Sequence, residues 1–468
     1  MIKISLTNLQ AKVLSYDTNV EYLALKKSLS FFVENYFWYS KYRAGRWDGK
    51  YCFYSRYTNS FPPGLLDVMP PRLQERFVIV DARRRPKIPA VQKPIKLEGI
   101  KLRDYQIEAI TEALKEERCV VQSPTNSGKT EIAAAIIKGL NVKTLFLTHL
   151  ENLLCQTRER LTKRLDSSVG IISANEWKPK QYTVAMIPTL YMRLKSKSKS
   201  AQNFLLNEVE CLFLDEVHHL SSTSWLYIAK RCNAYWRYGL SATPVARDAI
   251  SNLKLIGQTG KVIGAVTNVD LIERGISAKP LIKMVTNRTI GADLGKKAWF
   301  TAYRLGIEVN QNRNALMAKL IEKAVGEKKS VLVLINTIRH QNALYLECVE
   351  RIPPRQIAIL NGGTPIEDRM QAIKDMKRGK RTVILATPIF DEGMDMPEIR
   401  VLVLAGGGKS QIKLLQRLGR GMRKKTEGEN VVEVIDFWDV GNRYLVQHSK
   451  KRVEVYKSQG FEVQNVEI

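Results

Sequence analysis

Residues 123–130, SPTNSGKT, constrain the fold more than any other segment, because they join a short apolar run to a predicted helix. The run before them, RCVVQ, has the length and composition of a buried strand. In a strand–turn–helix unit of this kind, backbone N–H groups of the turn and the positive end of the helix form a cradle for phosphate. Lys129 would reach the β- and γ-phosphates, and the Thr130 hydroxyl would ligate Mg²⁺. The segment therefore predicts an α/β domain that binds ATP and Mg²⁺.

The turn departs at two positions from the usual phosphate-binding pattern. Ser123 stands where glycine is usual, and Asn126 stands where another glycine is frequent. Asparagine adopts left-handed backbone conformations more readily than most residues, so the turn can still form. We expect Asn126, Ser127 and Gly128 to line the nucleotide together with Lys129.

Short apolar runs alternate with helical segments from about residue 96 onwards. TLFLTH and CLFLDE lie in the first part, and VLVLINT, TVILATP and VLVLAGG lie in the second. Parallel sheets covered by helices on both faces contain such continuous apolar strands, and ligands gather at the carboxyl ends of these strands. We predict two consecutive α/β units, residues 96–275 and 276–468.

Residues 1–95 differ from the rest and end in RRRPKIPAVQKP, which is typical of an exposed linker. Aromatic and basic residues alternate here with turn signals, which predicts a small β-rich domain with hairpins. Most of the aromatic residues would form its core, since so small a domain has little else to bury. Exposed ones can stack on bases, and Arg46, Trp47 and Lys50 are candidate DNA contacts. A turn anchored by the Trp47 indole explains that residue at least as well.

The charge balance favours a polyanionic partner. Lys and Arg total 74 against 46 Asp and Glu, a net charge of +28. A basic surface gains affinity for nucleic acid by releasing counterions from phosphates, although charge alone does not distinguish DNA, RNA and anionic lipid.

The six cysteines lack CxxC spacing, which disfavours a zinc site or a disulfide framework. No signal peptide or membrane span is predicted, so we expect a cytoplasmic protein, in the bacterial host if viral. The oligomeric state stays open, and a monomer is compatible with these features.

Asp215 and Glu216 follow the apolar run CLFL. Asp215 at a strand end can hold the Mg²⁺ shell, and Glu216 can polarise the attacking water, because metal binding and base catalysis are separate tasks. The alternative is an acidic pair that merely ends a strand. A metal site on His218 and His219 is disfavoured, since adjacent side chains point in different directions.

The segment QRLGRGMR, residues 416–423, supplies two arginines three positions apart. Arg420 and Arg423 can share a helical face and can reach the charge that develops on the γ-phosphate during hydrolysis. The alternative is a basic patch that continues through Lys424 and Lys425 and contacts backbone phosphates. The two roles are compatible, since different residues can perform each.

These motifs, in their order and spacing, resemble superfamily-two helicases over roughly residues 100–440. LRDYQIEAI places Gln106 at the adenine-reading glutamine, SPTNSGKTE is similar to motif I, and LDEVHHL is similar to motif II. LSATP resembles motif III, ATPIFDEGMDMPEI motif V and QRLGRGMR motif VI. The resemblance implies two tandem RecA-like parallel-sheet lobes after a small β-rich N-terminal domain. It also implies nucleotide contacts for Gly393 and Asp395. Coupling of hydrolysis to movement is implied for His218, Ser241, Thr243 and Gln416.

Nucleic-acid contacts follow from the same resemblance. Motifs Ia and Ib correspond loosely to LFLTHLENLL and AMIPTLYMRL, which makes Thr148 and Thr189 candidate phosphate contacts, and motif V adds Thr387. A narrower resemblance joins GRWDGKYCFYSRYTNSFPPGLL and two later segments to the UvsW-type branch-migration helicases of phages. It implies an ATP-dependent DNA helicase that acts on forks, D-loops and four-way junctions in recombination, repair or replication restart. A duplex translocase, an RNA helicase and a non-catalytic DNA clamp are the alternatives.

Overall fold

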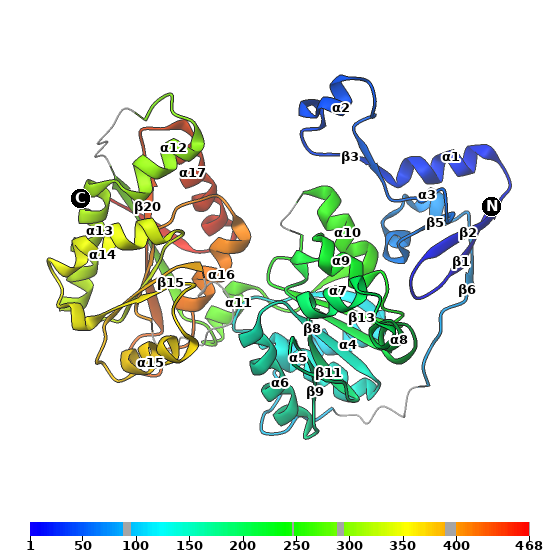
Figure 1. The fold of residues 1–468 in the computed structure, drawn as a ribbon, viewed down its shortest axis with the longest axis horizontal. Coiled ribbons are helices and arrows are strands. Elements are labelled where there is room, and N and C mark those ends of the chain that lie inside the picture. The colour runs from blue at the N-terminus through cyan, green and yellow to red at the C-terminus, as the bar shows by residue number, and fades with distance from the viewer. Residues whose placement is uncertain (88–94, 246–247, 288–293, 389–398, 468) are drawn as a thin grey trace. The chain divides into compact units, whose positions relative to one another are not determined.

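The computed structural model describes residues 1–87, 95–245, 248–287, 294–388 and 399–467. They form two compact units (Figure 1). One comprises residues 1–123 and 128–266, and the other comprises residues 124–127 and 267–468. In this part of the chain, the structure contains no helix that is both long enough and apolar enough to cross a membrane.

The first unit begins with a small sheet of strand order β5-β2-β1-β6, which confirms the prediction of a β-rich N-terminal domain. Alternate residues Ile2, Ile4 and Val13 are buried, as expected for a sheet with one covered face. A second hairpin, β3 with β4, carries two short helical turns. The elements are β1 (Ile2–Leu6), β2 (Ala11–Tyr16), α1 (Asn19–Ser28), β3 (Ser30–Phe32), η1 (Tyr36–Trp38), α2 (Ser40–Arg43), β4 (Lys50–Cys52), β5 (Ser60–Phe61), η2 (Pro63–Val68), α3 (Pro71–Gln74) and β6 (Phe77–Asp81).

Lobe 1 follows in the same unit as an eight-stranded sheet of order β10-β9-β11-β8-β12-β13-β7-β14. Only the pairing of β10 with β9 is antiparallel among its described strands. The apolar runs predicted as strands form its centre, and their residues are buried on both faces. The strands are β7 (Arg118–Gln122), β8 (Thr144–Thr148), β9 (Gly170–Ile172), β10 (Trp177–Lys178), β11 (Tyr182–Met186), β12 (Cys211–Asp215), β13 (Trp236–Ser241) and β14 (Lys261–Gly264).

Helices cover both faces of the lobe 1 sheet. In β12, Phe213 packs with α4, α5 and α6, whereas Leu212 and Leu214 pack with α7, α9 and α10. This alternation is the period-two pattern of a strand between two helical layers. The helices are α4 (Asp104–Glu116), α5 (Lys129–Leu140), α6 (Glu151–Leu165), α7 (Ile187–Lys195), α8 (Lys199–Asn203), η3 (Phe204–Glu208), η4 (Val217–His219), α9 (Thr223–Ala229) and α10 (Ala249–Thr259).

The N-terminal domain and lobe 1 share one hydrophobic cluster. Leu65 and Met69 of the domain pack with Ile250 and Leu253 of α10. A Cβ added to Gly257 of α10 would lie 2.9 Å from a side-chain carbon of the domain, so only glycine permits this approach. The domain is therefore packed onto lobe 1 rather than merely tethered to it.

Lobe 2 contains a seven-stranded sheet, all parallel among its described strands, of order β17-β18-β16-β19-β20-β15-β21. One face packs against α13 and α14, and the other packs against α15, α16 and part of α17. The two parallel-sheet lobes confirm the predicted fold class. The strands are β15 (Lys279–Asn287), β16 (Val331–Leu334), β17 (Ile357–Leu360), β18 (Val383–Ala386), β19 (Val401–Leu404), β20 (Val431–Asp439) and β21 (Glu462–Val466).

The remaining helical segments of this unit surround that sheet. Two of them, α12 and η5, lie between β15 and α13 and have no counterpart in the sequence prediction. The segments are α11 (Asn268–Glu273), α12 (Trp299–Tyr303), η5 (Arg304–Glu308), α13 (Gln311–Gly326), α14 (Ile338–Val349), η6 (Pro354–Gln356), α15 (Ile366–Lys377), α16 (Gln411–Gly421) and α17 (Arg443–Ser458).

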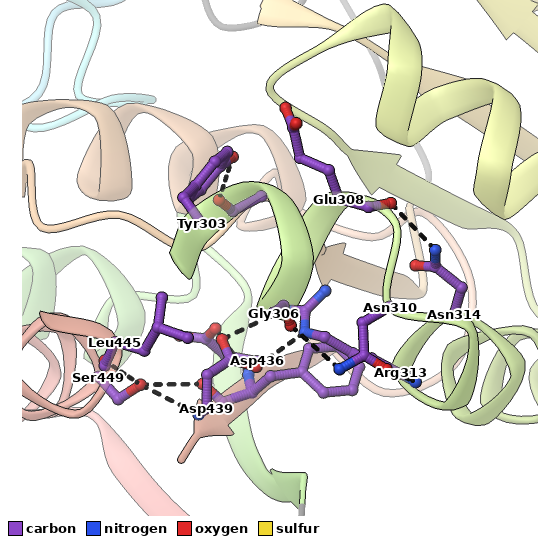
Figure 2. A network of polar contacts seen from close by, with 12 residues as sticks. Tyr303, Gly306, Glu308, Asn310, Arg313, Asn314, Asp436, Asp439, Leu445 and Ser449 are labelled. Carbon is purple, nitrogen blue, oxygen red and sulfur yellow. Dashed lines mark hydrogen bonds and ion pairs between the residues drawn. The ribbon is translucent and has the colours of Figure 1, made fainter. Parts of the chain in front are cut away.

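A buried polar network fixes η5 and α13 against β20 (Figure 2). The guanidinium of Arg313 donates from Nε to Asp439 at 2.8 Å, and both side chains are almost fully buried. Asn314 donates to the backbone carbonyl of Glu308 at 3.1 Å, and its own side-chain oxygen lies 3.1 Å from Nε2 of His340. Buried charges and amides are costly unless they are paired, so these contacts favour one arrangement of η5 and α13 on β20.

Acid should destabilise lobe 2 through His340. Burial, and secondarily the nearby Arg313 charge, lowers the pKa of His340 to about 3. Because an unfolded histidine has a pKa of about 6.5, the unfolded chain binds the extra proton as pH falls below that value. Stability from this residue is present above pH 6.5 and decreases by up to about 1.4 kcal/mol per pH unit towards the folded pKa.

A His340→Gln variant should therefore show a shallower loss of stability between pH 6.5 and 4.5. Hydrogen exchange of α13 and α14 would measure it, because lobe 1 does not contribute to that signal. Identical pH dependence in the two proteins would contradict a neutral buried His340.

Candidate functional site

The predicted phosphate loop connects β7 to α5. Its backbone is left-handed at Asn126, with φ of 71°, and at Gly128, with φ of 83°. The Ser127 hydroxyl donates to the Pro124 carbonyl at 2.6 Å and closes the turn. Asn126 thus has the left-handed conformation that asparagine tolerates, and the turn leads directly into the N-terminus of α5.

Gln106 lies over this loop from the first turn of α4. A Cβ added to Gly128 would lie 2.4 Å from Nε2 of Gln106, and the left-handed backbone at this position also favours glycine. The Gln106 side-chain oxygen accepts from the Arg103 backbone N–H at 2.9 Å, which fixes the amide orientation. The glutamine predicted to read adenine therefore stands beside the phosphate loop.

The predicted lysine and carboxylates also come together in lobe 1. Nζ of Lys129 lies 3.4 Å from Oε1 of Glu216, and both side chains are largely buried. Burial, followed by the Glu216 charge, raises the pKa of Asp215 to about 6, while Lys129 opposes the rise. Two carboxylates beside one lysine leave negative charge uncompensated.

Glu216 connects this cluster to motif III. Its backbone is left-handed, with φ of 48°, which is uncommon for a non-glycine residue and typical of functional sites. Nδ1 of His218 lies 3.3 Å from Oε2 of Glu216 and 3.1 Å from the Ser241 hydroxyl. That hydroxyl in turn accepts from the Thr243 backbone N–H at 3.1 Å. The three predicted coupling residues of lobe 1 thus form one chain that starts at the carboxylate.

These residues fit a nucleotide with a divalent cation. The loop offers a glycine cradle at a helix N-terminus, which suits phosphate. A Mg²⁺ ion beside Asp215 would neutralise the two carboxylates and favour their ionised forms, and oxygen ligands are those that Mg²⁺ prefers. Thr130 is the second residue of α5, next to Lys129, and can supply the hydroxyl ligand. Lobe 1 therefore has the donor groups for ATP and Mg²⁺.

Lobe 2 holds an arginine that the sequence interpretation missed. Arg417 of α16 is buried and donates from Nη2 to Asn336 at 2.9 Å. The Asn336 amide donates to the Tyr303 hydroxyl and to the Gly406 carbonyl, both at 2.8 Å. Arg417 lies inside QRLGR and was thus available as a candidate, but its partner Asn336 is 81 positions away in the chain, and nothing in the sequence joins the two.

The other residues of the arginine segment have separate environments. Gln416 is buried, and Arg420 and Arg423 are half-buried. Lys425 is buried, and its ammonium donates to the carbonyls of Ile399 and Gly421 at 2.6 and 2.7 Å. Lys425 therefore closes the C-terminus of α16 and does not belong to an exposed basic patch.

The predicted nucleic-acid contacts are dispersed. Thr148 is fully buried at the end of β8, so its side chain is not on the surface, and Thr387 is largely buried after β18. Thr189 is half-exposed in the first turn of α7. Gly393 and Asp395 lie outside the described residues.

Arg46 and Trp47 lie between β3 and β4, and Lys50 is the first residue of β4. The Arg46 side chain is exposed. The Trp47 indole donates to the Lys50 carbonyl at 2.8 Å, and Asp48 accepts from the Lys50 backbone N–H at 3.1 Å. This is the anchored turn that was weighed against DNA contact for Trp47.

Comparison with known proteins places these motifs in two family models. Residues 99–246 match the family described as the type III restriction enzyme res subunit, and residues 312–425 match the helicase conserved C-terminal domain. The DNA 3'-5' translocase XPB2 of Sulfurisphaera tokodaii is 28% identical over 378 residues, which cover 73% of this chain and 83% of that protein. The ATP-dependent DNA helicase uvsW of Enterobacteria phage T4 is 23% identical over 391 residues, 76% and 75% of the two chains.

Coverage is smaller for other relatives. The putative DNA 3'-5' helicase Rad25 of Haloarcula marismortui is 26% identical over 71% of this chain, but the match spans 52% of that protein. Among solved structures, the type ISP restriction-modification enzyme LlaBIII bound to DNA aligns with a TM-score of 0.59 at 15% identity, covering 86% of this chain and 34% of that one. At this identity the likeness shows the fold alone.

Proposed function

We propose, from the premise that this chain is a superfamily-two helicase of two RecA-like lobes, that it uses ATP and Mg²⁺ to remodel branched DNA. The observation that carries the proposal is the lobe 1 cluster, in which Lys129 and Glu216 lie 3.4 Å apart beside a phosphate-binding turn. Forks, D-loops and four-way junctions are the proposed substrates. Recombination, repair or replication restart in the cytoplasm would supply them.

Each group of the cluster has a defined task in hydrolysis. Lys129 would bind the β- and γ-phosphates, and Thr130 and Asp215 would hold Mg²⁺, which would supply positive charge beside the transferred phosphate. Glu216 accepts a proton from the attacking water. The contacts of His218 with Glu216 and Ser241 then relay the state of the carboxylate to motif III. Arg420, Arg423, Gln416, Gly393 and Asp395 are the proposed contributions of lobe 2.

DNA is the proposed partner for two reasons. The net charge of +28 favours a polyanion. The names of the translocase XPB2 and the helicase uvsW both specify DNA. An RNA substrate stays the main alternative, because the ATP-site motifs are the same in both classes.

The β3–β4 projection, residues 30–52, supports recognition of branched structures, and we call it the aromatic arm (Figure 1). Trp38 is 67% exposed, Phe32 is 54% exposed and Tyr39 is 52% exposed. The Arg43 guanidinium lies 5.1 Å from the Trp38 ring, and Nζ of Lys50 lies 4.7 Å from the Phe32 ring. Exposed rings paired with cations are the chemistry that stacks on unpaired bases while contacting phosphates.

Removing exposed rings of the arm should impair junctions more than linear DNA. For Trp38→Ala with Phe32→Ala we expect about fivefold or greater loss of fork unwinding, since one stacked base contributes about 1–3 kcal/mol. Single-strand-stimulated ATPase activity should stay near the parental value, because every proposed nucleotide contact lies beyond residue 100. Point variants are preferable to deleting the domain, which would expose Ile250 and Leu253 of lobe 1.

Leu23→Ala provides the matched control, because this apolar side chain is 60% exposed on α1 of the same domain but outside the arm. It should process forks at the parental rate. Equal losses on forked and linear DNA in the arm variant would remove the arm from substrate recognition.

Arginines of motif VI should act mainly in the transition state. We expect Arg420→Ala and Arg423→Ala each to lower ATP turnover by roughly 10³-fold or more, with a much smaller change in nucleotide affinity. Steady-state turnover and equilibrium binding of a fluorescent ATP analogue would separate the two effects. A loss confined to DNA affinity would assign these arginines to phosphate-backbone contacts instead.

A further inference from the structure

A pocket of about 540 Å³ lies between the N-terminal domain and lobe 1, within the first unit. Lys230 at the end of α9 and Lys254 of α10 line it from lobe 1, and Gln10, Tyr51 and Ser60 line it from the N-terminal domain. Lys230 precedes β13 at its amino end, whereas the proposed ATP contacts follow the carboxyl ends of the strands. The pocket is therefore separate from the nucleotide site.

The charged side chains among the described residues that line this pocket are both basic. Among the described residues that line it there is no aspartate or glutamate, and neither Lys230 nor Lys254 has an ion pair in the described structure. Partial burial, followed by the charges of Lys254 and Arg231, lowers the pKa of Lys230. The two ammonium groups repel each other, and an anion that binds between them relieves this repulsion and is therefore favoured.

The position of Lys254 is set by an aromatic ring. Its Nζ lies 4.9 Å from the ring centroid of Tyr51, which itself packs edge-on against Phe53 at 4.8 Å. Lysine is otherwise a flexible point charge, and the cation–π contact holds its ammonium in the pocket. The ring and the cation form one preorganised wall.

Hydroxyl and amide groups complete the opposite wall. The Ser60 hydroxyl donates to the Gln10 side-chain oxygen at 2.9 Å and lies 2.7 Å from the Thr58 hydroxyl. The Gln10 amide nitrogen is left as a donor. Two cations, neutral donors and an aromatic surface together suit a phosphate that carries a planar or sugar group.

The two walls are held in a fixed relation. The shared cluster of Leu65 and Met69 with α10 lies beside the pocket, and Pro62, which lines it, approaches Gly257 at a distance that excludes a Cβ. Binding there needs no domain closure, so little ordering entropy opposes it.

We propose that this pocket binds a phosphodiester of the nucleic acid, with the phosphate between Lys230 and Lys254 and the attached sugar or base against Tyr51. The inference rests on the proposed function for its nucleic-acid partner and adds a contact on lobe 1 outside the helicase motifs. Tyr51 belongs to β4 and therefore to the aromatic arm, so the arm and the pocket share this residue.

The test is the salt dependence of DNA binding by Lys230→Gln/Lys254→Gln, measured without ATP on linear duplex and single strands. The magnitude of the logarithmic slope of affinity against salt should fall by about 0.9 on duplex and about 0.7 on single strands, the values for one phosphate contact, with roughly tenfold weaker binding at low salt. Lys138→Gln/Lys163→Gln makes the same charge change on α5 and α6 and should leave the slope unchanged. Thermal unfolding verifies that both variants are folded. An unchanged slope in the pocket variant would overturn the proposal.

Two further probes identify the source of the phosphate. DNA in which methylphosphonates replace single linkages should bind the parental protein more weakly at one position, and the pocket variant should be insensitive there. If the pocket variant instead loses only inorganic phosphate binding and keeps parental DNA affinity, the pocket is a free-anion site and the proposal fails. Linear DNA without ATP keeps this result independent of branch preference, so fork selectivity can fail while the pocket assignment stands.

Discussion

Lys129→Ala should reduce ATP turnover by at least about 10²- to 10³-fold, the range for removing one group that stabilises transition-state charge. Lys129 is the first residue of α5, directly after the left-handed Gly128, and its ammonium lies 3.4 Å from Glu216. Its loss also leaves Asp215 and Glu216 without the cation that opposes the raised pKa of Asp215. We therefore expect weaker nucleotide binding as well as slower chemistry.

Lys138→Ala is the matched control, because it makes the same change in the last turn of the same helix. Turnover should be near parental there, and hydrogen exchange of α5 should show that both variants are folded. Near-parental turnover in Lys129→Ala would refute the assignment of the phosphate loop.

Glu216→Gln should bind ATP and DNA but turn over about 10²- to 10⁴-fold more slowly, because the amide keeps the shape and loses the base. The left-handed backbone at this residue and its contact with His218 place it between the phosphate lysine and motif III. We expect the complex to accumulate before hydrolysis, with ATP retained on the protein. Single-turnover hydrolysis and filter retention of labelled ATP would measure both properties.

Glu159→Gln on α6 serves as the control, since it removes an exposed carboxylate of the same lobe. If Glu216→Gln hydrolyses ATP at the parental rate, Glu216 is not the base. If it fails to bind ATP, its role is structural.

Local chemistry made the two sheets and the phosphate loop predictable. Runs such as VLVL and CLFLD are buried on both faces and therefore carry a continuous apolar pattern that few other structures produce. Asparagine was expected to permit the turn because it tolerates a left-handed backbone, and Asn126 has that conformation. These features depend on residues within about ten positions of one another.

Features that depend on distant residues were not predictable. Arg417 is positioned by Asn336 and Tyr303, which come from different elements and have no local signature. Lys425 continues a basic run in sequence, yet the end of α16 buries its ammonium against two carbonyls. The pocket beside Tyr51 arises only because the N-terminal domain packs on α10. In each case tertiary packing determines the role of a charged residue, and the sequence alone does not distinguish that residue from an exposed surface charge.

Strand separation on a forked DNA and on a linear duplex of the same sequence tests most directly whether this protein is an ATP-driven motor directed to branched DNA. ATP and Mg²⁺ would be present, and an RNA fork would run in parallel. We expect ATP-dependent unwinding that is faster on the DNA fork than on the linear duplex or the RNA fork, and that is abolished by Glu216→Gln. Equal rates on forked and linear DNA, or preference for the RNA fork, would contradict it.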